Sequence, residues 1–520
     1  MPGSFQTSSY TECLHDLLLR NRAPLLLRAL RSGALCPGII TVALMPGYYG
    51  ALYGAPAVSA GHQQMEAQVS SEDSDGSDDG WGEEEPVSTL MMRGFLEMEN
   101  HFSTNREQEP GSVSGKNEFR GMMFLKYGTA AVYFESESSL YAIPYLVSTG
   151  MNGEYRYSEG TVIHRNLRVS SEGSELSFRK LFVNYETGTY RFRAGNQIIA
   201  WGTADVFGPT SYFNPYDLRE FLFKGEDEQR LGVPALSCLR LFGKDSLELV
   251  VVPVHVPIAM PVRGNFWEIR YREGPFPIVL DEPEGLPAAF ENIGAGLQYY
   301  TNRLGTDIYV SLYHGPDREP VMRPLGTVAE PGRPVAVEVR PEYCTVTNAG
   351  IAASRTFGKF VVQCEGVYSP DKAGVVWQDF NKDITLPFDV ARSQYAAYST
   401  GFNYFIPMRK FFRSHEGDAV LTMEWSQAFY IDDRIMKPLI TDILIARIQD
   451  SFTGNRLKVF LTGIMDFGHR SSVVMPEVQY RFQCGVSAAV SYAHIQSDSE
   501  SYIGYYDDND LLTVRVRYDL

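Results

Sequence analysis

The feature that most constrains this chain is an alternation of apolar and polar residues that recurs from about residue 89 onward. In the final stretch, LLTVRVRYDL, every second side chain from Leu512 to Leu520 is apolar, and the side chains between them are polar. The same alternation marks residues 421–429 and 456–466. A period of two places apolar side chains on one face of a β-strand, whereas a helix would repeat every three to four residues. The chain is therefore predicted to be all-β.

Three observations favour a membrane barrel over a soluble sandwich. Many alternating segments run for about 9–12 residues, the length of a tilted membrane crossing. Charged side chains lie in mid-strand on the polar faces, as a water-filled lumen allows. The chain has 31 Tyr and 30 Phe, and many of these aromatic residues lie near strand ends, as in the aromatic girdles of membrane barrels. Short turns such as 186–189 alternate with long links such as 201–234. Residues 439–450 are apolar on both faces, which indicates a strand covered from within or a short helix.

A strand edge cannot be left unpaired in lipid, so the last strand is expected to pair with the first, residues 90–102. The predicted architecture is a single antiparallel transmembrane β-barrel of about 16 strands, with 14 to 18 possible, over residues 89–520. Its predicted location is the outer membrane, among membrane lipids. The alternating last strand suits the outer-membrane barrel insertion machinery, although such strands usually close on Phe or Trp rather than on a residue like Leu520. A homo-oligomer is left open, since trimers are common among porin-type barrels.

The first 88 residues have a different composition. Arginines such as Arg28 and Arg31 precede a stretch, 32–65, with no charged residue, which predicts a signal peptide over residues 1–60 with cleavage after Ala60. Residues 61–88 are predicted to be an acidic disordered linker, because 72–85 carry eight acids and no base. The net charge of −17 argues against nucleic acid as a partner.

The cysteine and histidine spacing shows no pattern typical of a metal site. The six cysteines include no CxxC pair, and no His/Cys cluster has zinc-ligand spacing. We therefore expect neither a metal site nor a disulfide framework, and no cofactor.

Residues 191–220 read RFRAGNQIIAWGTADVFGPTSYFNPYDLRE. A strand that ends in R-x-G-x-Q leads into W-G, and an N-P-x-D turn follows. This segment resembles one found in porin-like outer-membrane barrels of largely unassigned function, and the resemblance supports the barrel. The matching positions are Arg193, Gly195, Gln197, Trp201, Gly202, Asn214, Pro215 and Asp217.

The same segment is the predicted site of a pore constriction. Asn214 and Pro215 suit the cap and the first position of a short helix running through Phe223, which would fold into the pore. An acidic row would then face a basic row across the pore and create a transverse field that orders polar solutes. The acidic row is Asp205, Asp217 and Glu220, and the basic row is Arg191 and Arg193. The segment also fits a structural loop packed against the wall, or an external loop.

The polar faces of the cleanest strands carry nine bases and seven acids, so the predicted lumen is of mixed charge with a slight positive lean. The residues expected to face the lumen are Arg340, Glu424, Arg456, Lys458, Arg481, Arg515 and Arg517. These charges could equally pair across strands. The predicted function is a porin-like channel that lets small polar solutes diffuse, with at most mild anion preference.

Other functions fit parts of the same pattern. A surface adhesin would share the barrel and differ only in its loops. A lipid-modifying outer-membrane enzyme would need a nucleophile beside a base, and the only suggestive string is His469–Ser472 at a turn. A soluble secreted all-β protein would need no membrane. We expect a channel and no enzyme.

Overall fold

The computed structural model describes most of the chain from residue 89 onward. The described residues are 89–104, 116–143, 156–158, 160–206, 208–220, 223–224, 228–262, 266–267, 278–328, 336–377, 386–412, 415, 417–438, 442–482, 484–497, 503–507 and 509–520. The expected signal peptide, 1–60, and the expected linker, 61–88, lie outside them.

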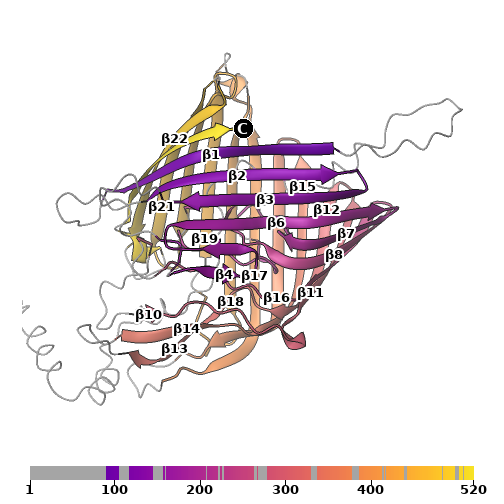
Figure 1. Ribbon diagram of the computed structural model, residues 1–520, viewed down its shortest axis with the longest axis vertical. Helices are drawn as coiled ribbons and strands as arrows, with labels where there is room; N and C mark the ends of the chain where they lie inside the picture. Colours follow the sequence, from indigo (N-terminus) through magenta and orange to yellow (C-terminus); the bar gives the residue numbers. More distant parts are fainter. Residues whose placement is uncertain are drawn as a thin grey trace, which may run out of the picture.

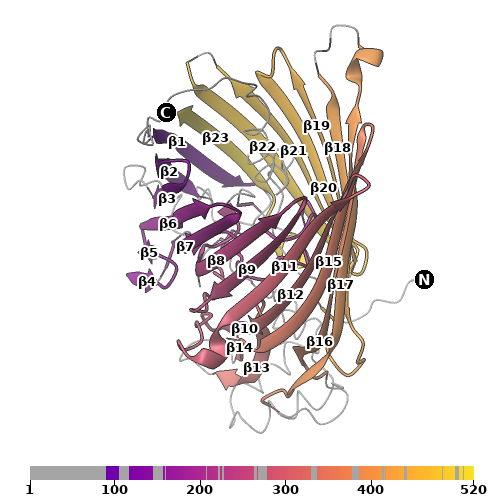
Figure 2. The ribbon, with the colours of Figure 1, turned by 90° about the vertical axis from the view of Figure 1, so that its right-hand side faces the viewer.

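The described residues form a closed antiparallel barrel of 18 strands, which confirms the predicted fold class at the upper end of the expected range. Each barrel strand pairs with the next one along the chain, and β23 pairs with β1 from Phe95↔Asp519 to Ser103↔Leu511. The expected pairing of the first and last strands is thus confirmed, and the ring of 18 strands is closed. Figure 1 shows the strands from the side, and Figure 2 shows them curving around an interior.

The barrel strands have the following bounds: β1 (Thr89–Ser103), β2 (Asn117–Gly128), β3 (Val132–Ala142), β6 (Ser174–Thr187), β7 (Tyr190–Gln197), β8 (Val233–Phe242), β9 (Asp245–Val252), β11 (Gly294–Arg303), β12 (Thr306–Pro316), β15 (Thr345–Phe357), β16 (Phe360–Val375), β17 (Val390–Ile406), β18 (Ala419–Tyr430), β19 (Asp442–Phe452), β20 (Leu457–Asp466), β21 (Ser471–Arg481), β22 (Val486–Ser497) and β23 (Leu511–Asp519).

The remaining described elements are small. Two three-residue strands, β4 (Val162–His164) and β5 (Arg168–Ser170), extend the sheet beside β6. A separate three-stranded sheet contains β10 (Ile278–Leu280), β14 (Ala336–Glu342) and β13 (Val321–Val328), and it lies below the barrel strands in Figure 1. Three short 3-10 helices are η3 (Phe290–Asn292), η4 (Met408–Lys410) and η5 (Gly504–Tyr506). None of the helices in the described part of the chain is long and apolar enough to cross a bilayer.

The alternation seen in the sequence separates the two faces of the wall. On β1, Met92 and Leu96 are exposed on the outer side, whereas Phe95 and Glu97 are buried inside. Because successive side chains of a strand point to opposite faces, the outer side of the sheet is a continuous apolar surface. A closed sheet with such an outer face satisfies every backbone group without water, as the hydrocarbon of a bilayer requires.

The two ends of the barrel differ in their connections. At one end the turns contain two to four residues, apart from 407–418, and β1 begins and β23 ends there. At the other end the links are longer, apart from the turn 467–470, and the longest, between β9 and β11, spans 253–293. Short turns face the periplasm in bacterial barrels and long loops face outward. We call these the short-turn end and the long-link end.

Apolar side chains fill much of the interior toward the long-link end. One buried cluster joins residues of the long links, such as Tyr216, Trp267 and Met322, to inward-facing wall residues such as Ile443 and Ile445. This cluster explains why residues 439–450 are apolar on both faces. Residues 442–450 of this passage belong to strand β19, which is covered from within, and not to a helix, whereas 439–441 lie outside the described residues.

Candidate functional site: the barrel interior

The link between β7 and β8, residues 198–232, folds into the barrel, and we call it the inner segment. Glu365 of β16 binds it through backbone N–H groups: Thr203 and Ala204 donate to Oε2 at 2.7 and 3.3 Å, and Thr210 donates to Oε1 at 3.4 Å. The hydroxyl of Thr210 donates to Oε2 at 3.2 Å. Glu365 is only 1% exposed, so its charge is stabilised by these donors rather than by water.

The W-G dipeptide allows this contact. Gly202 has a φ of +102°, and a Cβ built on it would lie 2.3 Å from Oε2 of Glu365. Only glycine therefore lets the backbone approach the carboxylate so closely. Trp201 fixes the preceding position, because its Nε1 donates to Glu248 of β9 at 2.9 Å and its ring lies edge-on to Phe213.

A second glutamate of the wall holds the next residues. Glu424 of β18 accepts the backbone N–H groups of Asp205 and Val206 at 2.8 and 2.9 Å. The Asp205 side chain accepts a hydrogen bond from Asn403 of β17 at 2.6 Å. Burial raises the pKa of the Asp205 carboxyl above its usual value. The inner segment is thus bound to three consecutive strands of the wall, β16 to β18.

The predicted helix starting at Asn214 is wrong for the described residues 208–220, which are extended or in turns. Asn214 instead joins the two ends of the inner segment: its Oδ1 accepts from Ile199 N at 2.7 Å, and its Nδ2 donates to Gln197 O and Leu231 O. The backbone is extended because partners outside a helix satisfy it, as where Asp217 N donates to Gln229 O at 2.7 Å.

Asp217 lies in a buried group of ion pairs that links the inner segment to β6. Arg219 contacts both oxygens of Glu175, at 2.6 and 2.9 Å, and also both oxygens of Asp217. Lys224 donates to Asp217 at 2.5 Å. Burial alone would raise the pKa of Asp217, but Arg219 and Lys224 hold it well below the usual range. The bidentate geometry fixes the orientation of the segment as well as its charge.

Glu220 joins a second group around Lys116, which lies just before β2. The Lys116 ammonium is 2.8 Å from Glu220, 3.0 Å from Glu118 and 3.3 Å from Glu99. Burial would lower the pKa of Lys116, but the surrounding carboxylates raise it well above its usual value. Glu99, His101 and Glu220 have the composition of a metal-ligand set, but Lys116 already supplies the cation that these carboxylates require.

The contacts of the described residues therefore do not form the opposed charge rows that the sequence predicted. The acids Asp217 and Glu220 pair with bases from their own segment and from the start of β2. Arg193 of β7 donates to Asn184 at 2.9 Å and lies over the Phe182 ring. Arg191 points to the same face of β7, two residues away along the strand. The physical reason is that the segment is extended and follows the wall, so its acids reach β1, β2 and β6 rather than β7.

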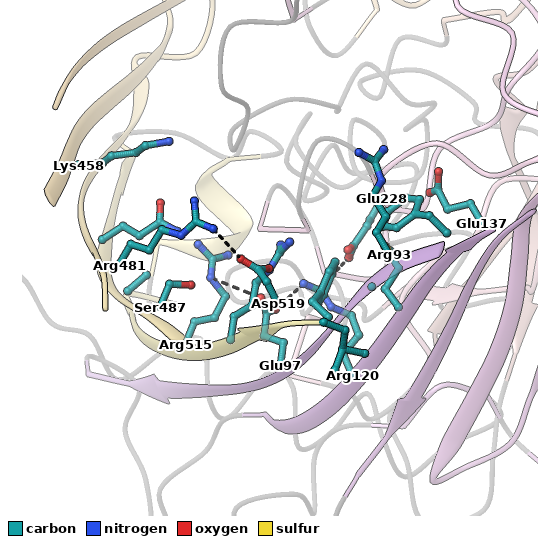
Figure 3. A pocket seen from close by; sticks show the side chains of 18 of the residues that line it. Arg93, Glu97, Arg120, Glu137, Glu228, Lys458, Arg481, Ser487, Arg515 and Asp519 are labelled. Atoms are coloured by element: carbon teal, nitrogen blue, oxygen red, sulfur yellow. Dashed lines mark hydrogen bonds and ion pairs between the residues drawn. The ribbon is translucent and has the colours of Figure 1, made fainter. Parts of the chain in front are cut away.

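Toward the short-turn end the interior opens into a cavity of about 830 Å³, adjoined by a second of about 600 Å³. We call the first the basic cavity, because nine basic and five acidic side chains line it. Figure 3 shows charged side chains of the first and last strands around it. Its lining residues are Arg93, Gly94, Phe95, Glu97, Arg120, Met122, Phe124, Glu137, Arg179, Lys180, Glu228, Arg447, Lys458, Phe460, Glu477, Gln479, Arg481, Ser487, Ala489, Arg515, Arg517, Asp519 and Leu520.

The inner segment reaches this cavity through Glu228. Arg120 of β2 pairs with Glu228 and with Glu97 of β1, so one arginine joins the segment to the wall at the edge of the cavity. The inner segment therefore borders the basic cavity.

Several residues expected to face the lumen line these cavities. Lys458, Arg481, Arg515 and Arg517 line the basic cavity, and Arg456 lines the adjoining one. Arg515 is 3.1 Å from Glu477, and Arg517 is 2.7 Å from Asp519, so part of this charge pairs between or along the strands.

The prediction that Arg340 faces the lumen from a barrel strand is wrong. It lies on β14 of the three-stranded sheet, where it pairs with Asp281 and Glu338, and not on a barrel strand. The alternation in this region is genuine, but it arises because Val337 and Val339 pack into the interior cluster while Arg340 is exposed.

Side chains of the turn that contains His469 hydrogen-bond to neighbouring residues of the same turn and of the adjacent strand. His469 Nδ1 lies 2.9 Å from Asp466, and the Ser471 hydroxyl lies 2.7 Å from the Ser497 hydroxyl.

Some residues that organise the interior were not chosen from the sequence. Glu118 and Arg120 lie on one face of β2, and Lys116, just before the strand, continues the same spacing of charges, which was a usable signal. The role of Glu365 depends on backbone N–H groups more than 150 positions away, which no local pattern reveals.

A closed antiparallel barrel with an apolar outer face and a charged interior defines the class of this protein: it is an outer-membrane β-barrel. A family model described as "Protein of unknown function (DUF1302)" matches residues 105–480, and the chain belongs to that family. Comparison with curated proteins gives no match.

Solved structures of bacterial outer-membrane proteins resemble the chain at low sequence identity. OccK9 (OpdG) of Pseudomonas aeruginosa is 10% identical with a TM-score of 0.45, covering 83% of this chain and 98% of that one. OccAB1 of Acinetobacter baumannii is 8% identical with a TM-score of 0.44, covering 82% and 96%. Salmonella typhi OmpF in complex with daunomycin is 8% identical with a TM-score of 0.39, covering 83% and 97%.

Proposed function

We propose that this barrel is a porin-like, non-enzymatic channel that lets small polar solutes cross the outer membrane with a mild preference for anions. The basic cavity carries the proposal. It lies inside a closed barrel near the short-turn end, and bases outnumber acids in its lining by nine to five. A positively charged cavity with low-dielectric walls raises the local concentration of anions. The inner segment would then control how far the cavity continues toward the long-link end.

Ion selectivity in planar bilayers tests this function. In a KCl gradient the reversal potential of the purified barrel should be shifted toward the equilibrium potential of chloride. Arg93→Glu together with Lys458→Glu should shift it toward potassium, because two cations of the lining become anions. Arg340→Glu is the matched control, since Arg340 lies outside the barrel wall. Strong cation selectivity of the unaltered protein would contradict the proposal.

A second candidate is a surface adhesin, in which the barrel only supports its outer links. The buried apolar cluster favours it, because residues such as Trp267 and Met322 fill the interior toward the long-link end. The same bilayer experiment separates the two functions. If neither the unaltered protein nor a variant with a loosened inner segment conducts, the adhesin is the better account.

A further inference from the structure

The basic cavity contains four arginine–phenylalanine stacks, each between neighbouring strands, and two of them, from Arg517 and Arg120, share the ring of Phe95. The guanidinium carbon of Arg517 lies 3.6 Å from the ring centroid of Phe95. Arg447 lies 4.8 Å from Phe460 in the same way. Arg93, directly opposite Phe124 in the ladder, lies 5.0 Å from that ring. A stacked guanidinium keeps its N–H groups, which lie in its own plane, for hydrogen bonds to an anion. The stacks thus place apolar ring surface next to hydrogen-bond donors.

Two cations of this cavity have no acidic partner. Across the described part of the chain, neither Arg93 nor Lys458 forms an ion pair, and both side chains are exposed in the cavity. By contrast, Arg515 and Arg517 each have a carboxylate within 3.1 Å. Figure 3 shows Arg93 and Lys458 on opposite sides of the cavity, on β1 and β20. An incoming anion could therefore approach either cation without displacing an existing ion pair.

We propose that the basic cavity is a binding site for organic anions that combine a carboxylate with an apolar, preferably aromatic, body. The carboxylate would bind the donors of Arg93 or Lys458, where a charge-assisted hydrogen bond is strongest. The body would lie against ring surface contributed by Phe124 and Phe460, since Phe95 is buried and its ring already contacts Arg517 and Arg120. An inorganic anion would use only the charge, and a neutral aromatic compound only the rings. A volume of about 830 Å³ is ample for such a ligand. This inference rests on the proposed function and specifies its substrate class.

Equilibrium binding to the full-length barrel in detergent tests the inference. Titration calorimetry with sodium benzoate should give a measurable affinity. Sodium acetate keeps the carboxylate without the ring, and benzyl alcohol keeps the ring without the charge. Each should bind about tenfold more weakly than benzoate, since each loses one of the two contributions. Equal binding of benzoate and acetate, or no benzoate binding at all, would overturn the inference.

Variants locate the site. Arg93→Gln together with Lys458→Gln should weaken benzoate binding by about tenfold or more, because it removes both unpaired cations. Phe460→Leu should weaken benzoate more than acetate, because it removes a ring from the lining. Arg340→Gln, with the same chemical change on the separate three-stranded sheet and away from the basic cavity, should leave the affinity unchanged. The altered cations are exposed, so folding should persist, as judged by the mobility of the unboiled protein on a gel. Unchanged benzoate affinity in the double variant would rule out this cavity as the site.

Failure of this inference can be told from failure of the proposed channel. Bilayer conductance without a benzoate preference over acetate would leave the channel and remove the substrate class. Benzoate binding without conductance in any variant would leave the site and remove the channel.

Discussion

Replacing Glu365 with Gln should release the inner segment from the wall without opening the barrel. In the native protein Oε2 accepts three hydrogen bonds and Oε1 accepts a fourth. A glutamine oxygen can keep the first three, but its NH₂ group then faces the N–H of Thr210, and the charge assistance is lost everywhere. Losing a hydrogen bond to a charged group costs about 2 kcal/mol, which is about a 30-fold change in the population of the released segment.

Hydrogen exchange measured by mass spectrometry reads this population directly. Peptides covering 203–210 should exchange about 30-fold faster in the Glu365→Gln variant, because local opening sets the exchange rate. Glu338→Gln makes the same chemical change in the three-stranded sheet and should leave these peptides unaffected. Peptides from β1 and β23 report in the same run whether the barrel remains closed. If 203–210 exchange at the native rate while those strands stay protected, Glu365 does not hold the inner segment.

Three further predictions concern the same interior. Gly202→Ala should speed hydrogen exchange over 203–210 as Glu365→Gln does, because the new Cβ would lie 2.3 Å from Oε2 of Glu365. Gly326→Ala is the control: its Cβ would have no neighbour within 4 Å, so exchange over 203–210 should not change. Lys116→Met leaves the buried carboxylates of Glu118 and Glu220 and the partly buried one of Glu99 without this cation, and it should destabilise the barrel by roughly 3–5 kcal/mol, seen as a lower temperature of gel-mobility change. An unchanged temperature would count against the ion-pair account. The two bases that contact Asp217 hold its pKa well below 3.8, so its contribution to stability is fully present above pH 3.8 and is lost as the pH falls from there through the folded-state pKa. Hydrogen exchange measured along an acid titration should show this loss. The Asp217→Asn variant should lack the part of the loss that Asp217 causes.

The barrel itself could be predicted from the sequence, because the period-two pattern directly encodes which face of each strand meets lipid. The residues of the last strand show this most clearly, since Val516 and Tyr518 face outward and Arg515 and Arg517 face inward, as their alternation predicts. The same pattern could not assign Arg340 to its sheet. Both a barrel wall and a small sheet packed on a core have one apolar face, so alternation alone does not distinguish them.

The interior was harder to predict, because its contacts join distant parts of the chain. Asn214 has the residue type of a helix cap, but its partners are backbone groups 15 and 17 positions away, which hold the segment extended. Likewise the acids of the inner segment were expected to face Arg191 and Arg193. Their actual partners depend on where the segment meets the wall, and that depends on tertiary packing.

The wall residues that bind the inner segment have a consequence for assembly. Thr203 and Glu365 are 162 positions apart, and Asp205 and Glu424 are 219 apart. Contacts this remote in sequence form slowly, since the long intervening chain must first be brought together. While the barrel folds, the inner segment therefore lacks these wall partners until β16 and β18 share a sheet with β7, and its docking cannot precede the assembly of that part of the wall.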